Sequence, residues 1–216
     1  MKILLQNDSP RTRGLIDLTI QHHTEWCAEN GWSYILDYSA GKWASIRNSM
    51  GVPDGSTLVW LDADAVVVGS LDDALSEDKD IGLTKWLGFH GKSFGVMYMR
   101  VGARVREFIS DVAMAEIVAK PAKTCAAHGG DEVSVLCKRP KNGLCERSLP
   151  LLQLHVEELD SKWNASDPGT EDLRVIAWHG MAMAEKAEAM AKFMDGEAGN
   201  TSCDCCTCCT CLGGGE

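Results

Sequence analysis

An apolar run interrupted by two aspartates, LVWLDADAVVV at residues 58–68, decides how this sequence folds. Asp62 and Asp64 stand one residue apart, at the point where a buried strand is expected to end. A carboxylate is costly to place among apolar side chains unless something neutralises its charge. Carboxylate oxygens suit Mg²⁺ or Mn²⁺, and these ions usually also bind the phosphates of a substrate. The run therefore predicts a strand end that binds a divalent cation and a phosphate-bearing ligand, with an acidic turn between two strands as the alternative.

The segments on either side of this run alternate between strand and helix patterns. A strand predicted at residues 3–6 precedes Ser9 and Pro10, which suit a helix N-cap and a first helical turn. The helix predicted over residues 10–30 ends at Gly31. Further strands are expected at 34–38, 57–61, 81–84, 95–99, 151–155 and 175–178, helices at 42–50, 104–119, 131–137 and 182–193, and a helical turn at 71–75. This alternation predicts one α/β domain.

The bulk composition is that of a soluble globular protein. The chain has 216 residues, of which 45% are hydrophobic and 24% are charged. Its formal net charge of -10 disfavours nucleic acid or an anionic membrane as the main partner. The sequence has no run of the roughly 18 apolar residues that a membrane span needs, and its apolar start is too short for a signal peptide. We therefore expect a cytoplasmic protein without a transmembrane segment.

The cysteines fall into two groups. Those in the body of the chain are Cys27, Cys125, Cys137 and Cys145, and we expect them to be reduced packing residues. The others lie within residues 203–211, in a segment rich in glycine, cysteine and threonine. Residues 195–216 are therefore expected to form a flexible tail outside a domain of residues 1–194. Metal binding, oxidation and lipid attachment are the alternatives for this tail.

A second apolar segment, VIAWHG at residues 175–180, ends in a histidine and a glycine. His179 can present a ring nitrogen to a metal, and Gly180 can let a phosphate approach the backbone. A structural histidine that bonds only within the protein is the alternative. Together with Asp62 and Asp64, His179 becomes a candidate third metal ligand.

The order of these features resembles that of GT-A type glycosyltransferases, nearest to the retaining galactosyl- and mannosyltransferase-like families with a Trp-Leu-Asp-x-Asp signature. The matching segments are NGWSY at 30–34, Trp43, WLDAD at 60–64, GVMYMR at 95–100, GDE at 130–132, KWNA at 162–165 and HG at 179–180. The resemblance spans residues 1–186 and excludes the tail. It implies a single GT-A, Rossmann-like α/β domain with a mixed, mostly parallel central sheet flanked by helices.

The resemblance also implies roles for individual residues. Mn²⁺ or Mg²⁺ would be bound by Asp62, Asp64 and His179. The residues implied to bind a UDP- or GDP-sugar donor are Gln6, Asn7, Asp37, Arg47, Asp62, Asn164 and Gly180. Asp131 and Glu132 match the segment near the anomeric carbon of the sugar, although a charge pair at a helix N-terminus explains them equally well. Asn164 is also explained by a turn.

The activity implied is metal-dependent transfer of a sugar from a nucleotide-diphosphate-sugar to a saccharide or other hydroxyl acceptor, with retention. The cation would neutralise the charge that builds on the departing diphosphate. The sequence departs from the family pattern in three places. Ser93 stands where an asparagine is common, Arg47 stands in a helix that commonly carries a lysine, and Met181 to Met183 follow Gly180 where a lysine is common, with Lys186 further along.

Two other functions fit parts of the sequence. Phosphatases of the haloacid dehalogenase type also place an Asp-x-Asp motif after an apolar strand, with the first aspartate as nucleophile, and residues 62–66 match it. That motif usually ends the first strand, whereas here a complete β-α-β unit comes before it. The remaining alternative is a protein that binds a nucleotide-sugar without turnover.

Overall fold

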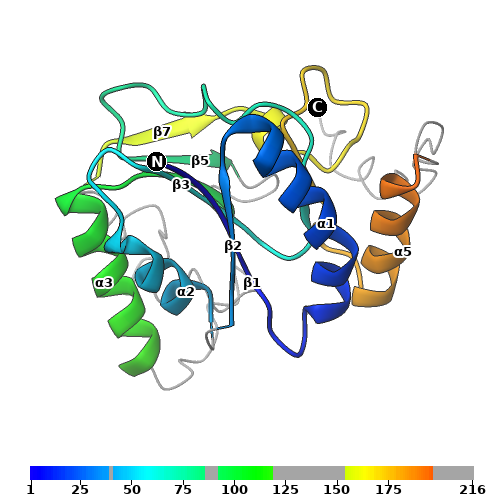
Figure 1. Ribbon diagram of the computed structural model, residues 1–216, viewed down its shortest axis with the longest axis horizontal. Coiled ribbons are helices and arrows are strands. Elements are labelled where there is room, and N and C mark those ends of the chain that lie inside the picture. The colour runs from blue at the N-terminus through cyan, green and yellow to red at the C-terminus, as the bar shows by residue number, and fades with distance from the viewer. Residues whose placement is uncertain (39–40, 86–91, 119–153, 197–216) are drawn as a thin grey trace, which may run out of the picture.

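A six-stranded sheet forms the centre of the computed structural model, which describes residues 1–38, 41–85, 92–118 and 154–196 (Figure 1). Its strands lie in the order β2-β1-β3-β6-β5-β7. Their bounds are β1 Lys2–Asn7, β2 Ser33–Asp37, β3 Thr57–Leu61, β5 Ile81–Lys85, β6 Lys92–Arg100 and β7 Val156–Leu159. The pairs β1–β2, β1–β3 and β5–β7 are parallel, and β6 runs antiparallel to both β3 and β5. The mixed, mostly parallel sheet expected from the sequence is therefore confirmed.

Helices cover both faces of this sheet, which explains why the sequence around β3 is apolar without alternation. They are α1 Arg13–Asn30, α2 Lys42–Asn48, α3 Ala103–Val118 and α5 Met183–Met194, with short 3-10 helices η1 at Ser49–Gly51 and η3 at Ser161–Trp163. Leu58 and Trp60 of β3 pack in one core cluster with residues of α2 and α3. Val59 and Leu61 point to the other face and pack with residues of α1. In Figure 1, α2 and α3 lie to one side of the sheet and α1 and α5 to the other.

A second, two-stranded sheet joins the segment after the aspartates to the segment before the histidine. It consists of β4 (Ala65–Val67) and β8 (Val175–Ala177), which pair antiparallel with Ala65 opposite Ala177. The ladder extends by one bond, because the Trp178 N–H donates to the Asp64 carbonyl at 3.0 Å. This sheet brings two segments more than 100 residues apart in the sequence to the same place.

Most predicted elements are present, but several of their bounds differ from the prediction, as at β6, which begins at Lys92 and not at residue 95. Helix α1 begins at Arg13 rather than residue 10, because residues 10–12 form a turn in which the Thr12 and Arg13 N–H groups both donate to the Ser9 carbonyl. Residues 71–75 form turns and no helix. Of the strand predicted at 151–155, residues 154 and 155 are described and are not strand, and β7 begins at Val156, which pairs with Ile81 of β5.

Several predictions fall on residues outside the described part of the chain. They include the helix at 131–137, most of the cysteine-rich tail and the cysteines Cys125, Cys137 and Cys145. Cys27 is buried and free, as expected for a packing residue, and burial raises the pKa of its thiol to about 12. Among the described residues there is no helix with the length and apolar character needed to cross a bilayer.

Candidate donor and metal site

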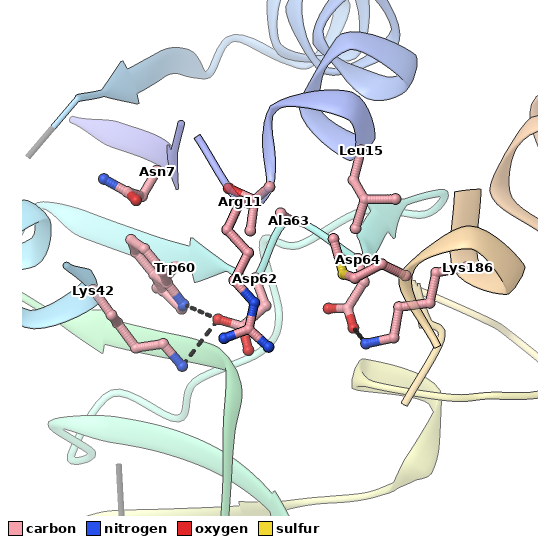
Figure 2. Close-up of a pocket in the computed structure, with 11 residues that line it drawn as sticks. Asn7, Arg11, Leu15, Lys42, Trp60, Asp62, Ala63, Asp64 and Lys186 are labelled. Atoms are coloured by element: carbon pink, nitrogen blue, oxygen red, sulfur yellow. Dashed lines mark hydrogen bonds and ion pairs between the residues drawn. The ribbon is translucent and has the colours of Figure 1, made fainter. Parts of the chain in front are cut away.

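A pocket of about 360 Å³ opens where β1 and β3 end, beside the first turns of α1 and α5 (Figure 2). The residues that line it are Asn7, Arg11, Thr12, Leu15, Lys42, Trp60, Asp62, Ala63, Asp64, Met183 and Lys186. In open α/β sheets, ligands bind at the carboxyl ends of parallel strands. The two aspartates of the predicted motif lie in such a position.

Asp62 is held by two donors that converge on one carboxylate oxygen. The indole Nε1 of Trp60 donates to Oδ1 at 2.9 Å, and Lys42 Nζ lies 2.9 Å from the same atom. The lysine also donates to the Phe94 carbonyl at 3.0 Å and lies over the Trp60 ring, 5.6 Å from its centroid. These contacts leave Oδ2 of Asp62 without a hydrogen bond from any described residue.

A buried polar network supports the backbone at Asp62 from behind the pocket. Gln6 Nε2 donates to the Asp62 carbonyl at 3.2 Å, while Gln6 Oε1 accepts from the Tyr34 hydroxyl at 2.8 Å and lies 2.9 Å from His23 Nδ1. His23 Nε2 accepts from the Val67 N–H at 3.3 Å, so Nδ1 carries the proton and donates to Gln6. Burial, together with the neighbouring His22, lowers the pKa of His23 to about 3, which keeps the ring neutral.

Asp64 is held differently, by an ion pair with Lys186 of α5. Its backbone carbonyl is the acceptor that extends the β4–β8 ladder to Trp178. Lys186 therefore reaches the pocket although it stands further from Gly180 than the family lysine does. The two helices that border this side, α1 and α5, pack against each other.

His179 lies close to Asp62, with Gly95 between them. An ideal Cβ placed on Gly95 would lie 3.2 Å from Asp62 Oδ2 and 3.4 Å from His179 Cε1, so the absent side chain leaves room between these groups. His179 Nε2 lies 2.9 Å from Asn164 Oδ1. Burial lowers the pKa of His179, and the nearby Asp64 and Asp62 carboxylates oppose that shift only in part. The imidazole is therefore neutral at pH 7, the form that can bind a metal.

The donor atoms at this site fit a divalent cation in their chemistry. Carboxylate oxygens and a neutral imidazole nitrogen are suitable ligands for Mn²⁺, and Gly95 leaves space beside them. Within the described residues, no three His, Cys, Asp or Glu side chains are grouped closely enough to form a complete metal site. In the structure, each carboxylate is instead neutralised by a lysine, Asp62 by Lys42 and Asp64 by Lys186.

The other residues implied to bind the donor lie in different surroundings. Asn7 lines the pocket and donates to the Asp37 carbonyl at 3.1 Å and to Ser45 Oγ at 2.9 Å. Asp37 ends β2 opposite Asn7 but is not among the residues that line the pocket. Gln6 is buried behind the pocket, where its polar atoms bond within the protein, so its direct contact with a donor is not supported.

The remaining predicted site residues are Arg47, Gly180, Asp131 and Glu132. Arg47 is exposed on α2 and does not line the pocket. Gly180 has a φ of 73°, which favours glycine, and it forms the turn between β8 and α5. Asp131 and Glu132 lie outside the described residues.

Arg11 and Lys42, which line the pocket, were missed by the sequence reasoning, and Lys186, which the sequence places further along than the family lysine, lines it as well. Arg11 lies just before α1, Lys42 is the first residue of α2, and Lys186 lies in the first turn of α5. Positive charges are unfavourable at helix N-termini, where the macrodipole and the unpaired N–H groups favour anions. Basic residues close to predicted helix starts could have indicated an anion site, because a bound anion would offset the unfavourable positive charge at those helix N-termini.

Solved structures with this fold include several glycosyltransferases. One, involved in the glycosylation of the major capsid of PBCV-1, has a TM-score of 0.60 and 16% identity over 88% of this chain and 98% of that chain. The apo form of the glycosyltransferase GlyE of Streptococcus pneumoniae TIGR4 has a TM-score of 0.53 and 12% identity over 89% of this chain and 59% of that one. The galactosyltransferase LgtC, in complex with donor and acceptor sugar analogs, has a TM-score of 0.52 and 13% identity over 91% and 96%.

These likenesses establish the fold of the chain. No protein-family model matches the sequence, and no curated protein matches it either. The chain has the α/β fold of these glycosyltransferases, with helices on both faces of a mixed sheet, as the resemblance implied.

Proposed function

We propose that this protein is a metal-dependent glycosyltransferase that moves a sugar from a nucleotide-diphosphate-sugar to an acceptor hydroxyl, with retention at the anomeric carbon. The observation that carries the proposal is the composition of the pocket. Two carboxylates lie in it at a strand end, a neutral histidine lies beside them, and three cationic side chains surround them. The glycosyltransferase fold supports the same function.

The side chains of the pocket have different roles in binding a diphosphate. Arg11, just before α1, and Lys186, in the first turn of α5, would supply positive charge for phosphate oxygens. Lys42 pairs with the Asp62 carboxylate and orients it. Asp62, Asp64 and His179 would hold Mn²⁺ or Mg²⁺, which when bound supplies Lewis-acid stabilisation of the leaving diphosphate.

Lys186 has two alternative partners in this proposal. In the structure it neutralises Asp64, which keeps the carboxylate from being an unpaired charge in a half-enclosed site. With a cation and a diphosphate bound, Asp64 would contribute to holding the cation, and the Lys186 ammonium would pair with the diphosphate. The charges of Asp64 and Lys186 would then be compensated both with and without ligand.

The test is a nucleotide-release assay with a panel of UDP- and GDP-sugars, in Mn²⁺ and after its removal by a chelator. We expect release that needs the metal and that falls at least about 100-fold in Asp64→Asn, because the variant loses a charged ligand without losing volume. Asp111→Asn is the matched control, since Asp111 is exposed on α3. Equal activity in the Asp64 and Asp111 variants would contradict the proposal.

The same assay separates the alternatives. Release of inorganic phosphate from a phosphomonoester would favour a phosphatase, but Asp62 here ends the third strand in the chain and not the first. Tight donor binding without nucleotide release in the presence of acceptors would favour a binding protein. The roles of Asp131 and Glu132 near the anomeric carbon stay part of the proposal, and Glu132→Gln tests them in the same reaction.

A further inference from the structure

We propose that Asn164 is a positioning residue that fixes the Nε2–H tautomer of His179 and so keeps the Nδ1 lone pair available to a metal. This inference rests on the metal-dependent function proposed above. It gives Asn164 a role through His179, in place of the direct contact with donor that the family resemblance implies.

The first observation is the way in which the Asn164 amide is held. Its nitrogen donates to Ser93 Oγ at 3.1 Å and to Thr84 Oγ1 at 3.3 Å. Both hydroxyls are buried, on β6 and β5 respectively, so these partners are fixed by the central sheet. With both amide N–H groups used, the carbonyl oxygen Oδ1 faces His179.

The second observation is the contact between the amide and the imidazole. Oδ1 of Asn164 lies 2.9 Å from His179 Nε2, and an amide oxygen can only accept. The proton must therefore be on Nε2, which leaves Nδ1 unprotonated in the neutral ring. A histidine that binds a metal through one nitrogen commonly donates from the other to a fixed acceptor, which sets both its tautomer and its orientation.

The third observation is the direction of the ring. Cε1, the carbon bonded to both nitrogens, lies on the side of Gly95 and Asp62 Oδ2. The backbone before His179 is also fixed, because the Trp178 N–H donates to the Asp64 carbonyl at 3.0 Å. The ring is thus anchored at one nitrogen and through its backbone, beside both carboxylates of the motif.

The elements that meet here are distant in sequence. Asn164 follows η3, the hydroxyls belong to β5 and β6, and His179 follows β8. Ser93 stands where the family pattern has an asparagine, and the structure uses the shorter hydroxyl as a partner of the Asn164 amide. The contacts of Asn164 with Ser93, Thr84 and His179 therefore depend on residues outside the Asp-x-Asp motif.

The direct test is ¹⁵N nuclear magnetic resonance of the imidazole rings in the metal-free full-length protein, with His179 assigned by comparison with His179→Gln. We expect the Nε2–H tautomer in the wild-type protein and its loss in Asn164→Leu, which removes the acceptor. Asn164→Asp is the conservative variant, and its carboxylate oxygen should retain the Nε2–H tautomer. An Nδ1–H tautomer in the wild type, or the same tautomer in Asn164→Leu, would overturn the inference.

Binding of Mn²⁺ alone, measured by electron paramagnetic resonance, is the second readout. We expect Asn164→Leu to weaken it by about 10- to 100-fold and Asn164→Asp to restore it to within a few fold of wild type. If Asn164→Leu does not fold, Ser93→Ala replaces it, because losing one amide partner should reduce the Nε2–H population; an unchanged population would count against the inference. A wild-type protein with the expected tautomer but no Mn²⁺ binding would leave the positioning role standing and contradict the proposed metal site.

Discussion

The two carboxylates of the pocket are each paired with a lysine, and the two pairs are built differently. Lys42 is almost completely buried, with 6% of its side chain exposed, while its partner Asp62 is 34% exposed. That lysine also bonds the Phe94 carbonyl and lies over the Trp60 ring. Lys186 has 16% of its side chain exposed, and among the described residues Asp64 is the only hydrogen-bond partner of its ammonium group.

The Lys42–Asp62 pair is therefore a structural pair. The Lys186–Asp64 pair is an exchangeable one, in which a ligand can replace either partner. Lys42 cannot leave Asp62 without also losing its bond to the Phe94 carbonyl in β6. Lys186 can leave Asp64 when another cation takes its place, because its ammonium group has no other hydrogen-bond or ion-pair partner within the described part of the chain. The Asp62 side of the pocket is therefore fixed before any ligand binds, and the Asp64 side is the one that can rearrange.

The largest effect that tests this comparison is on stability. Lys42→Met should lower the free energy of unfolding by about 3 kcal/mol, because it leaves the Phe94 carbonyl and Asp62 without their buried partner. Lys186→Met should lower it by less, about 1–2 kcal/mol, because Lys186 makes a single contact among the described residues, although the loss of that contact leaves Asp64, 12% exposed, without its partner. Urea unfolding of the two variants measures both values, and equal losses would remove the distinction between the pairs.

The next effect concerns His23, in the buried polar network behind Asp62, and the dependence of the free energy of unfolding on pH. His23 is neutral when folded, with a pKa lowered to about 3, but it can take up a proton when unfolded. The unfolded state therefore binds more protons below about pH 6.5, so stability should fall as the pH is lowered from there, with a slope approaching 1.4 kcal/mol per pH unit.

This slope is best measured by urea unfolding between about pH 6.5 and 4.5, above the range in which most carboxylates titrate. The lowered pKa of His179 contributes with the same sign. His23→Gln should remove the contribution of His23 and flatten the curve, and His179→Gln should flatten it less. A curve that is as steep in His23→Gln as in wild type would show that this buried ring does not control the acid sensitivity.

A smaller effect is expected on ligand binding at the exchangeable pair. Lys186→Met should weaken binding of a nucleoside diphosphate with Mn²⁺ by about tenfold, which is about 1.4 kcal/mol. Lys192→Met, on the exposed side of the same helix, is the matched control because its partner Glu188 is also exposed. Isothermal titration calorimetry measures both, and an unchanged affinity in Lys186→Met would place the diphosphate elsewhere.

The smallest effect compares two glycines. Gly95→Ala should change stability by less than about 1 kcal/mol, since the gain from a stiffer unfolded chain offsets a tight contact, but it should weaken Mn²⁺ binding by narrowing the space between Asp62 and His179. Gly14→Ala in α1 has open space around its new Cβ and should raise stability by about 0.5–1 kcal/mol without affecting the metal. Equal Mn²⁺ affinity in both variants would contradict a site beside Gly95.

The fold was predictable from the sequence because its signals are local. The apolar run of β3 is buried on both faces, and the helix pattern before Gly31 ends at that glycine, whose φ is 70°. The predicted bounds of helices and strands were wrong where a turn or the pairing register of a strand decides where the element begins. The start of α1 depends on the Ser9 and Thr12 bonds, and the start of β7 depends on which residue pairs with Ile81.

The candidate site was only partly predictable. Asp62 and Asp64 are neighbours in the chain, and the structure places His179 beside them through the β4–β8 pairing, although metal binding itself stays a prediction. Lys42 was overlooked in favour of Arg47, because both lie in the same short helix and only the packing shows which one faces the pocket. Gln6 was placed at the ligand, but its burial makes it a support for the Asp62 turn.

The sequence by itself determined the α/β class, the strand that ends in two aspartates, and the histidine and glycine that follow a late apolar segment. These are properties of residues near one another in the chain, where periodicity and the cost of burying charge apply directly. Only the tertiary structure decided which lysine neutralises which carboxylate and which amide faces the imidazole. Those partners come from segments far apart in sequence, and strand pairing and helix packing alone bring them within bonding distance.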